Sequence, residues 1–313
     1  MRVRDLPFVR AIDEGRRRTP IWLTYVVGIV LAVLVVQVVI GAGIRIATGH
    51  GNDLSSFASQ VIEGVTDLWP IAIVLLWVVL YERRPAGSLG LRDRRWWARL
   101  LGGLVLGGAL VTLGALPSIL SGQLVVVDGG PGTLTRTGAL GLVLATLPIW
   151  LIQGSSEEIV FRGFLLQRHL YSWPAWLAVV LLAALFAFIH PGGNLLAKLN
   201  ITLFGIFVSL LVLRQGTLWT AMGIHAGWNM VQGNVLGIAV SGEARDNTLV
   251  RLAPADGSSA ALTGGEFGTE ASVYLTVVLA VVVAVAFVAL RRYLARPDGG
   301  AGTGAATGAT VAA

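Results

Sequence analysis

One charged motif stands in a stretch of the chain that is otherwise apolar. The segment SSEEIVFRG (155–163) holds Glu157, Glu158 and Arg162. An ionisable side chain at membrane depth costs about 2.5–3.5 kcal/mol on insertion scales and marks a functional site. Glu158 and Arg162 are four residues apart and share a helix face, whereas Glu157 is turned by about 100°. We predict that Arg162 neutralises Glu158 while Glu157 faces an internal cavity; the alternative is a purely structural ion-pair cluster.

Two further segments supply histidines and a carboxamide. His190 closes the apolar run LLAALFAFIH, and GIHAGWNM holds His225 and Asn229. A lone histidine in an apolar helix is often only a hydrogen-bonding group. Here His225 and Asn229 are four apart, so one helix face presents an imidazole together with a carboxamide.

These groups are expected at similar depth. The apolar runs on either side of Ser172–Trp173 form an antiparallel helical hairpin, in which Glu157 lies 15 residues before Ser172 and His190 lies 18 after it. At about 1.5 Å per residue, the two depths differ by roughly one turn. Glu157 and His190 can therefore meet across the hairpin, and His225 falls in the same broad layer.

Such a set is suited to hydrolysing an acyl bond. A buried glutamate next to a histidine can activate water, because the carboxylate accepts a proton while the imidazole orients the water. His225 and Asn229 can donate to a developing oxyanion. The residues Glu157, His190 and His225 could instead ligate zinc with an open position for water. The sequence leaves open a divalent metal such as zinc or no cofactor.

Composition identifies the class of protein. The chain of 313 residues is 55% hydrophobic and only 13% charged, with a mean hydropathy of +0.76. Soluble domains are about 25% charged, so we predict an all-α polytopic membrane protein. The net charge of +6 is then a property of cytoplasmic loops and not of nucleic-acid binding. The chain has no cysteine, which excludes disulfides and thiolate chemistry.

Apolar runs long enough to cross a bilayer predict about eight transmembrane helices. They cover 21–44, 66–81, 97–120, 138–168, 174–190, 195–213, 217–240 and 271–290. We expect a cytoplasmic segment at 1–20, one membrane domain at 21–296 with its catalytic core at about 138–240, and a disordered low-complexity tail at 297–313. The segment 241–270 would be the longest extracytoplasmic loop.

Basic residues predict the orientation. Alternate loops and ends place 17 arginines on one face and five basic residues on the other, with Arg162 inside a span completing the 23. Cytoplasmic loops carry the excess of basic residues, so both termini are predicted to be cytoplasmic. The arginine-rich composition is typical of a GC-rich bacterium, which predicts a multi-pass protein of the bacterial cytoplasmic membrane.

Taken in order, the motifs E-E-x-x-x-R, F-x-x-x-H (Phe186 to His190) and H-x-x-x-N resemble those of the CAAX-protease and bacteriocin-processing family of intramembrane endopeptidases. The segments LGLRDRR and GGEFGTEAS (264–272) also resemble parts of bacterial members.

The resemblance implies an activity and a role for each matched residue. Glu157, with His190, would activate water, His225 and Asn229 would form the oxyanion hole, and Glu158 and Arg162 would support the site. The substrate would be a peptide or protein C-terminus, or a small peptide such as a bacteriocin precursor, in contact with membrane lipid. The family is commonly labelled as metalloproteases. Two other classes stay open: a non-catalytic immunity or scaffold protein, and a proton- or cation-coupled transporter, against which no repeat of the polar motif is found.

Overall fold

A computed structural model describes residues 2–51, 54–128, 134–135 and 138–296. The predicted tail at 297–313 and Arg136 lie outside the described residues. The helices and short helical segments (η, 3-10 or π) are η1 Val3–Asp5, α1 Pro7–Arg10, η2 Ala11–Glu14, α2 Ile21–Tyr25, η3 Val26–Ile40, α3 Gly41–Ala47, α4 Phe57–Leu76, η4 Trp77–Glu82, η5 Ala86–Leu89, α5 Trp96–Leu120, α6 Leu140–Glu158, η7 Ile159–Leu165, α7 Leu166–Ser172, α8 Ala175–Ile189, α9 Leu195–Gln215, α10 Trp219–Met230, η8 Val231–Val235, α11 Ala260–Thr263, η9 Gly265–Phe267, η10 Thr269–Ala271 and α12 Val273–Leu294. The strands are β1 Leu124–Val126, β2 Leu134–Thr135, β3 Asn247–Thr248 and β4 Leu252–Pro254.

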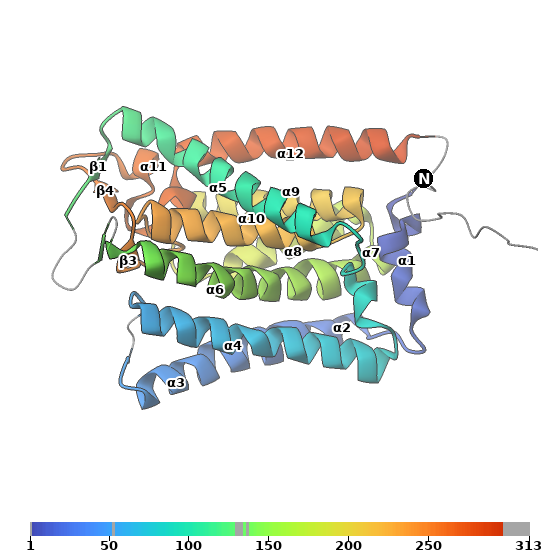
Figure 1. Ribbon diagram of the computed structural model, residues 1–313. Helices are drawn as coiled ribbons and strands as arrows, with labels where there is room; N and C mark the ends of the chain where they lie inside the picture. Colours follow the sequence, from blue (N-terminus) through green and yellow to red (C-terminus); the bar gives the residue numbers. More distant parts are fainter. Residues whose placement is uncertain (1, 52–53, 129–133, 136–137, 297–313) are drawn as a thin grey trace, which may run out of the picture.

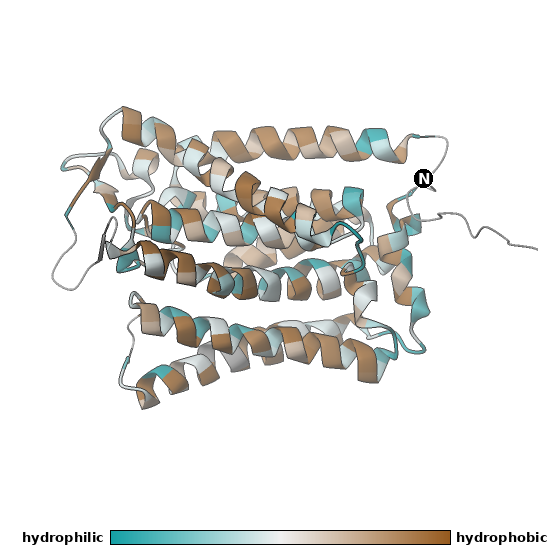
Figure 2. Ribbon diagram, viewed as in Figure 1, coloured by the Kyte–Doolittle hydropathy of each residue, from teal (hydrophilic) through white to brown (hydrophobic). Residues whose placement is uncertain are grey.

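The prediction of a mostly helical chain is confirmed. Each of the eight apolar ranges is helical over most of its length. The helix of the second range begins at Phe57, nine residues before its predicted start, and that of the seventh ends at Val235, five residues before its predicted end. Within the described part of the chain, four helices are long and apolar enough to cross a membrane: Phe57–Glu82, Trp96–Leu120, Leu195–Gln215 and Val273–Leu294. That all eight ranges cross stays a prediction. Large apolar side chains are exposed along the outside of the bundle, as on α12 at Val277, Val281 and Val285. Figure 2 shows that hydrophobic residues make up most of the length of α12.

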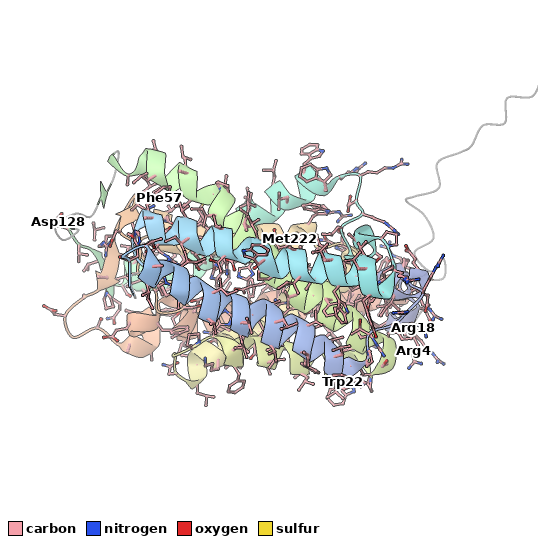
Figure 3. The ribbon with its side chains drawn as sticks, turned by 90° about the horizontal axis from the view of Figure 1, so that it is seen from below. Arg4, Arg18, Trp22, Phe57, Asp128 and Met222 are labelled. Atoms are coloured by element: carbon pink, nitrogen blue, oxygen red, sulfur yellow. The ribbon has the colours of Figure 1, made fainter. Side chains whose placement is uncertain are left out.

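The long helices run side by side and give the bundle two distinct ends (Figure 1). The end that holds α1 and α7 is called the inner end here, and the end that holds the four strands and α11 is called the outer end. Arg4 and Arg18 lie at the inner end and Asp128 at the outer end (Figure 3).

Helices α5 and α10 pack with almost no side chain between them. A Cβ added at Gly103 or Gly107 would lie 2.4 or 2.0 Å from a carbonyl oxygen of α10. One added at Gly223 or Gly227 would lie 2.2 or 2.1 Å from a carbonyl oxygen of α5. Each pair is four residues apart, the spacing with which small residues let membrane helices approach closely. This glycine seam fixes the position of α10.

The outer end departs from the all-α prediction. β1 pairs with β4 in antiparallel fashion and β2 pairs with β3 in parallel fashion. The segment Val240–Arg245 and the next residue, Asp246, are tied to the residues just before α4, since Arg245 Nη1 donates to Leu54 O at 2.6 Å and Asp246 accepts from Ser55 Oγ at 2.7 Å. These short pairings give the predicted extracytoplasmic loop a fixed structure.

Residues 2–20 are folded against the inner end. Phe8, Val9 and Ile12 are buried. Gln167 Nε2 donates to Phe8 O at 2.5 Å, and its Oε1 accepts from Arg84 Nη1 at 2.7 Å. These contacts make the N-terminal segment part of the bundle's inner end.

Candidate active site

Two consecutive glutamates at the end of α6 face different surroundings. Glu158 is fully buried and accepts from Arg162 Nη1 at 3.0 Å. The Glu157 side chain is 15% exposed and lines a cavity that Glu158 and Arg162 do not line. The difference follows from the turn of about 100° between adjacent helical residues. The predicted geometric division between the two carboxylates is therefore present in the structure.

Arg162 lies in the π-helical segment η7, whose seven residues are all buried. Its guanidinium carbon stands 4.3 Å from the ring centroid of Phe186 and 5.8 Å from that of Phe161. A guanidinium over an aromatic face is attracted by the ring quadrupole. Arg162 therefore has a carboxylate and two rings to compensate for its loss of hydration.

His225 on α10 contacts both carboxylates. Its Nδ1 lies 3.0 Å from Glu158 Oε1, and because a carboxylate only accepts, Nδ1 carries a proton and donates. Its Nε2 lies 3.7 Å from Glu157 Oε2. Glu158 thus fixes the ring so that Nε2 is turned toward Glu157.

Asn229 is connected to Glu157 through a residue that the sequence analysis did not select. Asn229 Nδ2 donates to Gln153 Oε1 at 3.0 Å, and Gln153 Nε2 donates to Glu157 Oε1 at 2.7 Å. Gln153 lies four residues before Glu157 on the same helix. That spacing alone would have placed Gln153 on the same helix face as Glu157. Glu157 Oε2, in contrast, is buried without a hydrogen-bond partner among the described residues.

His190 caps the C-terminus of α8 and lines the same cavity. Its Nδ1 lies 2.7 Å from Phe186 O. Since a carbonyl only accepts, Nδ1 donates and Nε2 keeps its lone pair. Lys198 Nζ donates to the backbone carbonyls of His190 and Ala187. No ion pair joins His190 to Glu157 in the described structure; the imidazole that stands against the Glu157 carboxylate is that of His225.

The four predicted catalytic side chains all line one cavity of about 400 Å³. It collects residues from η3, α3, α4, α6, α8, α9, α10, α12 and the segment Val240–Arg245. Phe204 packs edge-on to His225 and to Trp228, with ring centroids 5.4 and 5.3 Å apart. The cavity is thus polar around Glu157 and aromatic beside His225.

Two more buried acids line this cavity. Asp67 on α4 is 2% exposed, and its Oδ1 accepts from Ser156 Oγ at 3.5 Å. Glu270 accepts from Ser241 N at 2.5 Å. Burial raises the pKa of Glu270 above its ordinary value, and its hydrogen bonds with Ser241 act in the opposite direction. The folding of the outer end brings Glu270 here. Its segment GGEFGTEAS resembles part of bacterial members, but no helical spacing relates Glu270 to the other residues of the cavity.

A catalytic zinc site would need three protein ligands around one point. No group of three His, Asp or Glu side chains in the described ranges is placed to hold a metal ion. Glu157, His190 and His225 line one cavity without forming such a group. The residues in this arrangement do not fit a three-ligand zinc site, so the mechanism proposed below contains no metal-dependent step.

Comparison with known proteins finds a family match for one segment of the chain. Residues 139–231 match the family model described as type II CAAX prenyl endopeptidase Rce1-like. No curated protein matches the chain. The matched segment contains all six predicted site residues and runs from α6 to the start of η8. The resemblance read from the three motifs is thereby confirmed for this segment: residues 139–231 are similar to the type II CAAX prenyl endopeptidase Rce1-like family of proteases, and the four long apolar helices indicate an integral membrane protein.

Proposed function

We propose that this protein cleaves peptide bonds with water that Glu157 activates. The supporting observation is the placement of Glu157: it lies in the cavity, its Oε1 is held by Gln153, and its buried Oε2 has no hydrogen-bond partner among the described residues. A carboxylate with one oxygen held by a hydrogen bond and the other without one is suited to accept a proton from water.

In the proposed mechanism, Glu157 takes a proton from water as the water oxygen attacks the carbonyl carbon of the scissile bond. His190 Nε2, which keeps its lone pair, accepts a hydrogen bond from the same water and orients it. When the tetrahedral intermediate collapses, the C–N bond breaks and Glu157 returns the proton to the leaving amine. Atoms and charge are then restored to the resting enzyme.

The oxyanion of that intermediate needs donors that are already in place. Asn229 Nδ2 has a second hydrogen beyond the one given to Gln153, and His225 Nε2 donates when the ring carries both protons. Removing one oxyanion donor typically lowers kcat by about 10²–10³-fold. Glu158 and Arg162 act through His225, whose ring orientation they fix, so we assign them a positioning role.

We extend the proposal to the setting of the enzyme. It would lie in the cytoplasmic membrane of a bacterium as a single eight-span domain (21–296), with both termini in the cytoplasm and small peptides, including bacteriocin-like ones, as substrates. The arginine asymmetry and the nearly lysine-free basic composition support this setting.

The test compares cells that express the wild type, Glu157→Gln and Glu266→Gln. Glu266 is an exposed residue of the outer end, so its variant makes the same chemical change away from the cavity. Peptides that accumulate in membranes of Glu157→Gln cells, but not of Glu266→Gln cells, are the expected substrates. Cleavage of such a peptide by purified Glu157→Gln protein would disprove the assignment of the base. Equal peptide patterns in all three strains would favour the non-catalytic scaffold.

A further inference from the structure

The cavity is built only from the middle and the outer half of the bundle. Its residues nearest the bundle's end are Arg45 of α3, Leu54, Glu63 near the start of α4, and Glu243 and Arg245 of the outer segment. Arg245 Nη1 lies 3.3 Å from Glu63 Oε2, and its Nη2 lies 3.0 Å from Glu243 Oε2. The side chains of Glu63 and Glu243 are 26% and 35% exposed. The mouth of the cavity therefore lies at the outer end.

The opposite direction is closed by packed protein. From Glu157 toward the inner end, the chain continues through Glu158 and η7, in which every residue is buried. Below η7, Gln167 is fully buried and bonds to Phe8 O and Ser88 O. No residue that lines the cavity belongs to α1, α7 or the loop before α5. A peptide therefore cannot reach Glu157 from the inner end without unpacking these elements.

Basic residues indicate which end faces the cytoplasm. The inner end carries the N-terminal arginines, those of residues 83–99 and those at the end of α12, which together with Arg168 and Arg214 are the 17 of the predicted cytoplasmic face. Short loops rich in arginine are retained in the cytoplasm. The inner end is thus the cytoplasmic end, and the mouth of the cavity is on the other side of the membrane.

We propose that the catalytic cavity receives its substrate from the extracytoplasmic side, so that the enzyme cleaves secreted or externally exposed polypeptide segments. That the cavity binds a peptide substrate rests on the proposed function. That the substrate enters from the extracytoplasmic side rests on the position of the cavity and on the arginine asymmetry. The lining combines carboxylates with apolar side chains such as Val33, Ile201 and Leu279, which suits a peptide that is partly inserted in the outer half of the membrane.

The absence of cysteine from the chain makes a direct test available. Single substitutions Ala244→Cys (exposed, beside the mouth), Ala42→Cys (in the cavity wall) and Asp5→Cys (exposed at the inner end) are made in the full-length protein. Intact cells and inside-out membrane vesicles are treated with the membrane-impermeant reagent 2-(trimethylammonium)ethyl methanethiosulfonate. Thr66→Cys gives a second position in the cavity wall if Ala42→Cys is not produced.

We expect Ala244→Cys and Ala42→Cys to react in intact cells, and Asp5→Cys to react only in inside-out vesicles. Reaction of the first two only in the vesicles would show a cytoplasmic mouth and overturn the proposal. Reaction of Ala244→Cys without reaction of either cavity position from outside would overturn it as well, because the cavity would then be closed on that side.

Labelling does not depend on proteolysis. The catalytic role of Glu157 and the side of substrate entry can therefore be rejected independently of each other. Activity retained by Glu157→Gln would reject the catalytic assignment and leave the side of entry standing. A cytoplasmic labelling pattern, with Glu157→Gln inactive, would reject only the side of entry.

Discussion

Replacing Gly107 by alanine should destabilise the bundle and displace His225 and Asn229, the proposed oxyanion donors. The added Cβ would lie 2.0 Å from Ile224 O, about 1.4 Å short of the 3.4 Å at which ordinary contact begins. The obstructing atoms belong to the backbone of α10 and cannot rotate away, so α5 and α10 must separate. Such overpacking typically costs about 1–3 kcal/mol.

A neighbouring glycine provides the matched control. Gly102 lies on the same helix, and a Cβ added there would meet nothing within 4 Å. Both substitutions gain about 0.8–1 kcal/mol of helix propensity. That gain cancels in the comparison, so Gly107→Ala should be less stable than Gly102→Ala by the overpacking cost alone, while Gly102→Ala should equal or exceed the wild type.

The assay is thermal unfolding of the purified proteins in one detergent, followed by peptide cleavage. His225 and Asn229 stand on α10, and a displacement of 1 Å can cost about 10²-fold in rate. Gly107→Ala should therefore lose activity at temperatures where it is still folded. Equal stability of Gly107→Ala and Gly102→Ala would refute this prediction, because it would show that α5 and α10 can separate without loss of stability.

Three further predictions concern buried contacts and pH. Arg162→Met should lower the free energy of unfolding by about 3–5 kcal/mol because it leaves Glu158 buried without its cation; thermal unfolding should show partial recovery in the double variant that also carries Glu158→Gln. Trp150→Phe should cost about 1–3 kcal/mol in the same assay, since the buried Asn234 Oδ1 loses the indole donor at 2.7 Å. Burial and the neighbouring Glu63 raise the pKa of Glu243 to about 7. The Glu243 carboxyl group therefore holds its proton more tightly in the folded state than in the unfolded state. The free energy of unfolding of the wild type, relative to that of Glu243→Gln, should then fall as the pH rises from about 4.5 to 7 and stay constant above pH 7. A difference that grows with pH would contradict the raised pKa of Glu243.

Local spacing predicted the parts of the site that lie on single helices. Glu158 with Arg162, and His225 with Asn229, were paired from a separation of four residues, and the structure places each pair on one helix as expected. The same reasoning could have found Gln153. Helical periodicity is a local property, so it can be read directly from the sequence.

Relations between helices were harder to predict. The depth estimate predicted that Glu157 and His190 could meet across the hairpin. Both line one cavity, but depth gave no lateral order, and the ring that stands against Glu157 is that of His225. The approach of α5 to α10 depends on four glycines in two distant segments. Glu270 comes to the cavity through turns of the outer end that have no repeating pattern.

The π-helical turns of η7 have a consequence for how this protein can change during evolution. A π turn behaves as one residue inserted into an α-helix, so the residues after it are rotated relative to those before it. The part before η7 is matched to the reacting groups, and the part after it, with Arg168 bonded to Thr19 O at 2.7 Å, is matched to the N-terminal segment. Because η7 sets the angle between the helix before it and the helix after it, substitutions in one of these parts can accumulate without compensating changes in the other. Deleting a single residue from Ile159–Leu165 would remove this offset and force one of the two parts out of register.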